Sequence, residues 1–321
     1  MKLLHMTGAA LGALLLNGAA LAQSYPSKPI RLLVPFGPGG VGDITSRAVM
    51  QKMSEAIGQQ IIIDNRPSAG GIVATETVAK SDPDGYTLYL MNNTNAVSAA
   101  MFKKLPYDTV RDFETVSTIG GFSIVVLVSP DSPVKTTKDL IAQAKASNGK
   151  YNIGSINIGT TQHLSAELLK SMAALDMTTV PFNNTAGVLT ALRGGSVQIA
   201  MEFLPPVLGQ IRANTLRAVA VSSLARSPIL PNVPTLAESG LPGYEVNSWN
   251  GIAAPAKTPK AIVEKLNKEI HAAVNSPLIT QRFQELGVSQ NLSTPEGMRK
   301  VLVGDIAKWN ALIDKAKIQR Q

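Results

Sequence analysis

A glycine-rich turn near the N-terminus has the spacing of a phosphate-binding loop. Residues 37–43 read GPGGVGD, so that Gly37, Gly39 and Gly42 form the pattern G-x-G-x-x-G. An apolar run at 30–34 precedes the turn, a helical pattern follows it, and Asp64 lies about twenty residues further on. This arrangement is typical of a strand, turn and helix that bind a dinucleotide.

Two residues of this turn argue against a dinucleotide. Pro38 has no backbone N–H where a phosphate cradle needs a donor. Asp43 is the predicted N-cap of the following helix, and its carboxylate would occupy the place of the pyrophosphate. We therefore expect a loop whose glycine amides bind a smaller anion, either directly or through ordered water.

The sequence contains few residues that could catalyse a reaction. Its three histidines, His5, His163 and His271, are far apart, there is no cysteine, and neither a G-x-S-x-G nor an H-E-x-x-H motif is present. The sequence thus favours a protein that is not an enzyme and that holds neither a metal nor a cofactor. A secreted hydrolase whose Ser, His and Asp come from distant segments is the weakest alternative.

The first 22 residues are typical of a secretory signal peptide. Lys2 precedes an apolar stretch at 11–21, and Ala20-Leu-Ala22 forms a small-residue cleavage site. Cleavage there would leave 23–321, and a chain without cysteine forms no disulfide and carries no lipid-modified N-terminal cysteine. We therefore predict a protein of the periplasm that is not lipid-anchored.

Composition narrows the classes of ligand. The chain carries 30 Lys and Arg against 22 Asp and Glu, a formal net charge of +8, without any basic run. Only 5% of its residues are aromatic, so the sequence offers neither the basic stripe nor the stacking residues of a nucleic-acid-binding protein. A mild positive charge favours small anions instead.

Predicted strands and helices alternate along the chain, which indicates an α/β fold with parallel strands. A second series begins with an apolar strand at 123–129. Two helices are predicted near the C-terminus, with Thr258 and Thr294 as their N-caps, each directly before a proline at the first helical position. We expect two α/β lobes that close like a hinge around a cleft. The lobes comprise 23–123 with 245–321, and 124–244.

Several sequence motifs match those of a known family. They span most of the chain after the signal peptide and comprise Tyr25-Pro-x-Lys-Pro-Ile-Arg-Leu-x-Val-Pro-Phe36, Pro38-Gly-Gly-x-x-Asp43, Asn65-Arg-Pro-x-Ala-Gly-Gly71, Gly159-Thr-x-x-His163-Leu and Val233-Pro-Thr-Leu-Ala-Glu-Ser-Gly-Leu-Pro-Gly-Tyr244. In these motifs the chain resembles the Bug-type, TctC-like periplasmic solute-binding proteins of the tripartite tricarboxylate transporter family.

The resemblance implies a type II-like periplasmic-binding-protein fold, with two hinged α/β lobes and the ligand in the cleft between them. It also implies a monomeric, non-enzymatic receptor that captures a small carboxylate, delivers it to the permease subunits of a membrane transporter, and binds no nucleic acid. The resemblance leaves a second role open, in which the closed protein is a ligand-sensing input for a membrane signalling partner.

The same resemblance implies a set of ligand-binding residues. Gly39, Gly40 and Asp43 would hold one carboxylate from the first lobe. Asp and Thr residues also commonly cap helices, and His163 is more readily a packing residue of the interior than a ligand contact. Further polar contacts would come from both lobes: Asn93, Thr94, Ser155, Thr160 and Thr161.

Departures from the family pattern suggest the kind of ligand. The chain reads Phe182-Asn-Asn184 where relatives commonly have Tyr-Lys-Gly, and Glu202 keeps an acidic group although Gln198 replaces the familiar aspartate. Gly37 stands where relatives commonly have proline. Because Phe182 has a phenyl ring and the lysine of the relatives is replaced by Asn183, we expect a cleft with an apolar wall at Phe182. The ligand would then be a terephthalate-like aromatic acid or a C4 to C6 dicarboxylate. The alternative is that Phe182 packs in the core.

Overall fold

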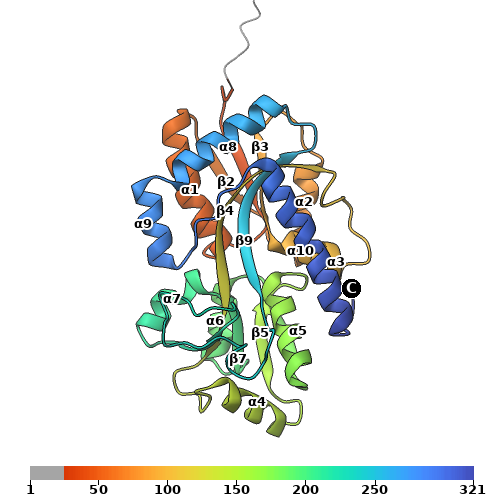
Figure 1. The fold of residues 1–321 in the computed structure, drawn as a ribbon, viewed down its shortest axis with the longest axis vertical. Coiled ribbons are helices and arrows are strands. Elements are labelled where there is room, and N and C mark those ends of the chain that lie inside the picture. Colours follow the sequence, from red (N-terminus) through yellow and green to blue (C-terminus); the bar gives the residue numbers. More distant parts are fainter. Residues whose placement is uncertain (1–24) are drawn as a thin grey trace, which may run out of the picture.

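The computed structural model describes residues 25–321, so the predicted signal peptide at 1–22 lies outside the described residues. Figure 1 shows two lobes stacked along the long axis and joined by two long strands, β4 (Phe113–Val128) and β9 (Asn247–Pro255). In this part of the chain, no helix is long and apolar enough to cross a membrane. The predicted α/β fold with two lobes is confirmed.

Lobe 1 is built on one end of the sheet, with the strand order β2-β1-β3-β9-β4. Strands β1, β2 and β3 are parallel, and β9 runs antiparallel to both β3 and β4. Its other elements are β1 (Ile30–Val34), β2 (Ile61–Asn65), β3 (Thr87–Asn92), α1 (Val41–Ile57), the 3₁₀ turn η1 (Ala69–Gly71), α2 (Ile72–Ala79), α3 (Asn93–Met101), α8 (Lys260–Val274), α9 (Pro277–Leu286) and α10 (Pro295–Lys315).

Lobe 2 repeats this topology at the other end of the sheet, with the order β6-β5-β7-β4-β8. Here β5 is parallel to β6 and β7, and β4 runs antiparallel to β7 and β8. In both lobes the fourth strand in this order, β9 in lobe 1 and β4 in lobe 2, runs antiparallel to its two neighbours. The other elements are β5 (Asn152–Ile156), β6 (Thr178–Phe182), β7 (Ile199–Phe203), β8 (Arg217–Val221), α4 (Thr137–Ala146), α5 (Thr161–Ala173), α6 (Thr185–Arg193) and α7 (Leu204–Arg212).

Strand β4 changes partners where it passes from one lobe to the other. Its pairing with β9 ends at Ser123, opposite Asn247, and its pairing with β7 begins at Ile124, opposite Phe203. The β4–β9 register is irregular shortly before this point, between Thr118 and Gly120. The exact lobe boundaries stay a prediction.

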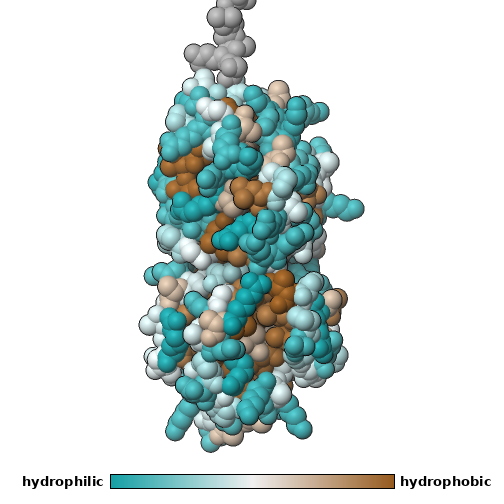
Figure 2. Space-filling view, turned by 90° about the vertical axis from the view of Figure 1, so that its left-hand side faces the viewer, coloured by the Kyte–Doolittle hydropathy of each residue, from teal (hydrophilic) through white to brown (hydrophobic). Residues whose placement is uncertain are grey.

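Burial explains why the central strands form. All five residues of β7 are buried, and in β1 only Arg31 is partly exposed, which is the pattern of strands covered on both faces. A smaller apolar cluster that includes Val188 and Val207 packs α6 and α7 against lobe 2. Figure 2 shows a largely hydrophilic surface with separate apolar patches on both lobes. The buried strands β1 and β7 thus hold the chain segments that follow them in fixed positions.

The observed helix starts correct two predictions. Gly40 is the N-cap of α1, so the prediction that Asp43 is the N-cap is wrong. Pro259, and not Thr258, is the residue before α8. The third prediction is confirmed, because Thr294 is the N-cap of α10 and its hydroxyl accepts a hydrogen bond from the N–H of Gly297.

Candidate functional site

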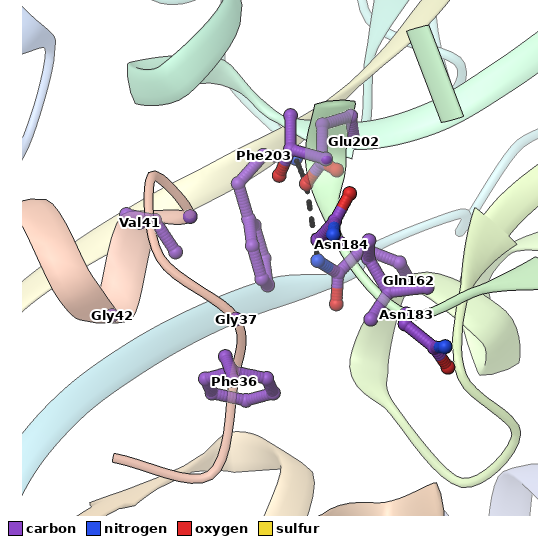
Figure 3. Close-up of a pocket in the computed structure, with 12 residues that line it drawn as sticks. Phe36, Gly37, Val41, Gly42, Gln162, Asn183, Asn184, Glu202 and Phe203 are labelled. Carbon is purple, nitrogen blue, oxygen red and sulfur yellow. Dashed lines mark hydrogen bonds between the residues drawn. The ribbon is translucent and has the colours of Figure 1, made fainter. Parts of the chain in front are cut away.

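A small cavity lies between the two lobes (Figure 3). Lobe 1 contributes the turn between β1 and α1, and lobe 2 contributes the ends of β5 and β7, the start of α5 and the turn between β6 and α6. The glycine-rich turn that the sequence marks as an anion site therefore faces lobe 2. The lining residues are Phe36, Gly37, Gly40, Val41, Gly42, Ile156, Gln162, Asn183, Asn184, Thr185, Glu202 and Phe203.

The lobes are closed around a water-sized space. The cavity volume is about 20 Å³, and a cavity of that size accommodates roughly one water molecule. Gly37 lies against lobe 2, since a Cβ atom added at this position would be 3.0 Å from the Cβ of Asn184. The lobes must therefore separate before a carboxylic acid can enter.

Four helices of the described chain begin at this cavity. Gly40, Asn184 and Phe203 are the N-caps of α1, α6 and α7, and Gln162 is the second residue of α5. Each helix N-terminus carries a partial positive charge and backbone N–H groups without partners in the helix. No side chain of the N-cap residue caps α1, which leaves its first turn open to a ligand. The convergence of these ends makes the cavity suited to an anion.

Asp43 holds the glycine-rich turn in place. Its carboxylate accepts hydrogen bonds from Gly39 N–H at 3.0 Å, Arg47 Nε at 2.9 Å and Asn65 Nδ2 at 3.0 Å. Burial acts to raise the pKa of this carboxyl, but the three hydrogen bonds and the charge of Arg47 hold the pKa below its usual value. Neither Asp43 nor Gly39 lines the cavity, so both shape the turn, whereas Gly40 faces the cavity.

Glu202 and Gln162 form a buried polar pair at the edge of the cavity. Glu202 Oε1 accepts hydrogen bonds from the N–H of Phe203 at 2.8 Å and from Gln162 Nε2 at 3.1 Å. Glu202 Oε2 and Gln162 Oε1 have no partner among residues 25–321, although the two residues are only 1% and 4% exposed. Burial raises the pKa of the Glu202 carboxyl, and the polar groups of Phe203, Gln162 and Thr185 offset only part of that rise.

Two phenyl rings from opposite lobes belong to the apolar part of the lining. Phe36 precedes the glycine-rich turn, and Phe203 ends β7, where it packs edge to face on Phe122 with ring centroids 4.7 Å apart. Phe182 does not line the cavity and packs against the smaller apolar cluster of lobe 2. In this closed arrangement the apolar lining comprises Phe36, Phe203, Val41 and Ile156, and a ligand contact of Phe182 stays a prediction.

Asn93, Thr94 and Thr161 join the lobes. Thr161 Oγ1 donates a hydrogen bond to Asn93 Oδ1 at 3.2 Å, and the hydroxyls of Thr94 and Thr161 lie 3.5 Å apart. Asn93 Oδ1 also accepts from Trp309 Nε1 at 3.0 Å, and Asn93 Nδ2 donates to Asp305 at 2.7 Å. These groups are buried and satisfy one another across the lobe interface instead of lining the cavity.

The other predicted polar residues of lobe 2 are also buried outside the lining. Ser155 donates a hydrogen bond to the Ile156 carbonyl at 3.0 Å. Thr160 is the N-cap of α5, and its hydroxyl accepts a hydrogen bond from the N–H of His163. This is the helix-capping role that the sequence analysis gives as the alternative to ligand binding. His163 is 8% exposed, its Nδ1 has no partner in the described part of the chain, and burial lowers the pKa of its imidazole.

Comparison with known families identifies the kind of protein to which this cavity belongs. Residues 45–318 match the model of the tripartite tricarboxylate transporter family receptor, TctC. The chain belongs to this family. The receptor is 32% identical over 316 residues to the protein BugT of Bordetella pertussis, which covers 97% of this chain and 96% of BugT. The family consists of solute-binding receptors, so this receptor is not an enzyme.

Solved structures of similar receptors share its fold. The R. palustris protein Rpa4515 with adipate matches it with a TM-score of 0.89 at 32% identity, over 92% of this receptor and 100% of that chain. MatC (Rpa3494) from Rhodopseudomonas palustris with bound malate matches with a TM-score of 0.86 at 28% identity, over 90% and 100% of the two chains. The predicted periplasmic-binding-protein fold is therefore confirmed.

Of the residues predicted to bind the ligand of this receptor, Gly40 and Glu202 line the cavity. Phe36 and Gln162 line it without having been predicted. Phe36 could have been found from its place directly before the glycine-rich turn. Gln162 could not, because only the observed start of α5 decides whether Gln162 or its neighbour His163 faces lobe 1.

Proposed function

We propose that this receptor captures a small carboxylate between its lobes by hinge closure and delivers it to the permease subunits of a tripartite tricarboxylate-type transporter. The observation that carries the proposal is the convergence of four helix N-termini, from both lobes, on one buried cavity. Their partial charges and N–H groups replace the water around a carboxylate without a paired cation. Because the two lobes share these groups, a bound anion favours the closed arrangement.

The lining supports a dicarboxylate or another acid with an apolar body. Gly40, Val41 and Gly42, at the first turn of α1, line the cavity, and Phe36 and Phe203 line it from the two lobes. The adipate and malate bound by the two similar R. palustris proteins are both aliphatic dicarboxylates. The predicted signal peptide, with the periplasmic character of the family, supports capture in the periplasm.

Thermal unfolding and calorimetric titration test the capture of a carboxylate. The processed protein, residues 23–321, is measured with mono-, di- and tricarboxylates, aromatic acids and NAD(H). An acid that binds only the folded protein raises its melting temperature, with about 2.7 kcal/mol of added stability at a hundred times its Kd. The methyl ester of the same acid is the control and should bind at least about tenfold more weakly, because it loses charge-assisted hydrogen bonds. No shift with any acid, or an ester that binds equally well, contradicts the proposal.

Delivery is tested in cells that lack the gene for this receptor. Uptake of the acid identified by calorimetry should fall and should return with the wild-type gene. Unchanged uptake, combined with loss of the transcriptional response to the acid, would contradict delivery to a transporter.

A further inference from the structure

A groove on the surface of the molecule is formed by residues of both lobes. Figure 1 shows the C-terminal end of α10, from lobe 1, beside α5 of lobe 2, and the Ser171 hydroxyl donates a hydrogen bond to the Ala316 carbonyl at 3.1 Å where they meet. The groove has a volume of about 390 Å³, within the roughly 300–1,000 Å³ of sites that hold a ligand. It shares no lining residue with the cavity between the lobes, so it is separate from the place proposed for the acid.

The two walls of the groove are mainly apolar. Leu168 and Met172 line it from α5, where they lie one turn apart, and Leu312 lines it from α10. Met172 is 37% exposed, and methionine is a flexible side chain that adapts to the shape of a partner. Exposed apolar side chains gathered in a groove indicate a surface that binds another molecule.

One cation lines the groove. Lys315 is exposed at the end of α10 and forms no salt bridge within residues 25–321. Asp314, next to it in the sequence, pairs with Arg320 and therefore leaves the charge of Lys315 unpaired. This charge is available to a carboxylate of a partner, and charge complementarity selects partners and speeds association.

The loop beside the groove belongs to one of the family motifs. Pro242 and Gly243 line the groove and lie in the motif at 233–244. Both are exposed, whereas Tyr244 is buried and donates a hydrogen bond to the Ser165 carbonyl at 2.7 Å, which fixes the loop on α5. The motif does not line the cavity for the acid. Similar receptors hold acids as different as adipate and malate, so an exposed motif away from the acid fits the partner that receptors of this family share, which is the transporter.

The groove depends on closure of the lobes. One wall belongs to α5 in lobe 2 and the other to α10 in lobe 1. Opening of the hinge would move the walls apart and break the hydrogen bond between Ser171 and Ala316. A partner that fills the groove therefore binds the closed receptor more tightly than the open one.

We propose that this groove is the surface by which the receptor docks on its transporter, and that an acidic and apolar periplasmic segment of a permease subunit occupies it. The inference rests on the proposed function, because it names the surface at which delivery takes place. An apolar side chain of the segment packs between Met172 and Leu312, and a carboxylate of the segment pairs with Lys315. A second copy of this chain is a poorer occupant, because two chains with a formal net charge of +8 repel each other.

Two substitutions in the groove test the proposal in cells that lack the chromosomal gene for the receptor. Lys315→Glu reverses the charge of the lining, and Met172→Glu places a charge on its apolar wall. At low receptor expression, each variant should lower uptake of the acid identified by calorimetry at least about fivefold, because the new charge opposes docking of an acidic segment. Calorimetric titration of the purified variants should give the acid affinity of the wild type, since neither residue lines the cavity between the lobes.

The matched controls lie on the same helix and outside the groove. Lys300→Glu repeats the charge reversal at an exposed lysine of α10, and Val303→Glu repeats the apolar-to-acidic change at a side chain that is 47% exposed. Both controls should support uptake like the wild type. Wild-type uptake in the two groove variants overturns the proposal, and so does an equal loss in the groove variants and the controls.

Other occupants of the groove give different results. Sedimentation of the purified receptor with saturating acid would reveal a second copy as a dimer that Lys315→Glu abolishes. Normal uptake with loss of the transcriptional response to the acid in both groove variants would assign the groove to a signalling partner. Either result overturns the transporter as the occupant.

The proposed function and this inference fail in different ways. If the wild-type receptor does not support uptake, delivery to a transporter fails and this inference fails with it. If the wild type and the groove variants support uptake equally, delivery stands and only docking at this groove is lost. Lys315→Glu, at an exposed side chain, decides the question even if Met172→Glu does not fold.

Discussion

Thr161, at the start of α5 in lobe 2, donates a hydrogen bond to Asn93, at the start of α3 in lobe 1, with 3.2 Å between Oγ1 and Oδ1. Trp309 and Asp305 of α10 hold the Asn93 side chain in place from the other side. The acceptor is thus fixed within lobe 1 whether or not Thr161 is present. The bond between Thr161 and Asn93 therefore contributes to closure and not to the fold of either lobe.

Thr161→Val should weaken ligand binding without unfolding the protein. Valine keeps the shape of the side chain and removes its hydroxyl, and such a hydrogen bond contributes about 0.5–1.5 kcal/mol, or roughly a 2- to 10-fold change in affinity. Calorimetric titration with the best acid measures this loss, and the melting temperature without ligand should change little. Thr190→Val, on the exposed surface of α6, is the control. Equal affinities in the two variants would show that this bond does not support closure.

Gly37→Ala should hold the lobes apart. The added Cβ would be 3.0 Å from Asn184 Cβ in the closed arrangement, which is shorter than the usual carbon contact of about 3.5–4.0 Å. We expect the affinity for the best acid to fall several-fold, and the radius of gyration with saturating acid to exceed that of the wild type in small-angle scattering.

Gly209→Ala provides the matched control for this steric test. A Cβ at Gly209 meets no atom within 4 Å, so this variant should close and bind like the wild type. If Gly37→Ala closes as fully as Gly209→Ala, the turn can move to accommodate the added methyl group, and Gly37 does not limit closure.

The sequence predicts the alternation of strands and helices well, but it predicts only the last part of β4. The predicted strand at 123–129 matches the apolar end of β4, which starts ten residues earlier at Phe113. In that earlier part β4 contains Thr115, Ser117 and Thr118, and it forms a strand because it pairs with β9, far away along the chain. Pairing of this kind leaves no local pattern, since β propensity depends on neighbours.

The site shows the same limit. The sequence identifies the glycine-rich turn and an acidic group at Glu202, and both line the cavity. The sequence does not show that the carboxylate of Asp43 accepts hydrogen bonds from other protein groups, because one of the donors, Asn65, lies at the end of β2. The side chains at 93 and 161 likewise look available in the sequence, and only the packing of one lobe on the other shows that they bind each other.

Asp43→Asn should destabilise the protein in a pH-dependent way. The pKa of Asp43 is lowered in the folded protein, so its contribution to stability is present above the unfolded pKa of about 3.9 and is lost as the pH falls through the folded pKa. Urea unfolding at pH 7 should show a loss of about 1.5–3 kcal/mol, the range for hydrogen bonds to charged groups. The difference from the wild type should shrink as the pH falls below about 4.

Asp131→Asn serves as the control for Asp43→Asn, because Asp131 is exposed and lies after β4, away from the glycine-rich turn. The unfolding free energy of Asp131→Asn should match that of the wild type both at pH 7 and below about pH 4. A loss in Asp43→Asn that stays constant with pH would mean that the ionised form of Asp43 has no special role in holding the turn.

Phe36→Ala and Phe182→Ala separate the observed apolar wall from the wall that the sequence predicts. Phe36 lines the cavity from lobe 1, whereas Phe182 packs on the apolar cluster of lobe 2. Burying an aromatic side chain contributes about 1.5–3 kcal/mol, so Phe36→Ala should reduce the affinity for adipate by roughly tenfold or more and that for the shorter succinate by less. Phe182→Ala should lower the unfolding free energy by up to about 3 kcal/mol and leave the ratio of the two affinities unchanged. The opposite result, in which only Phe182→Ala alters that ratio, would place the specificity wall at β6 and would mean that the lobes close on a ligand differently from the arrangement in Figure 3.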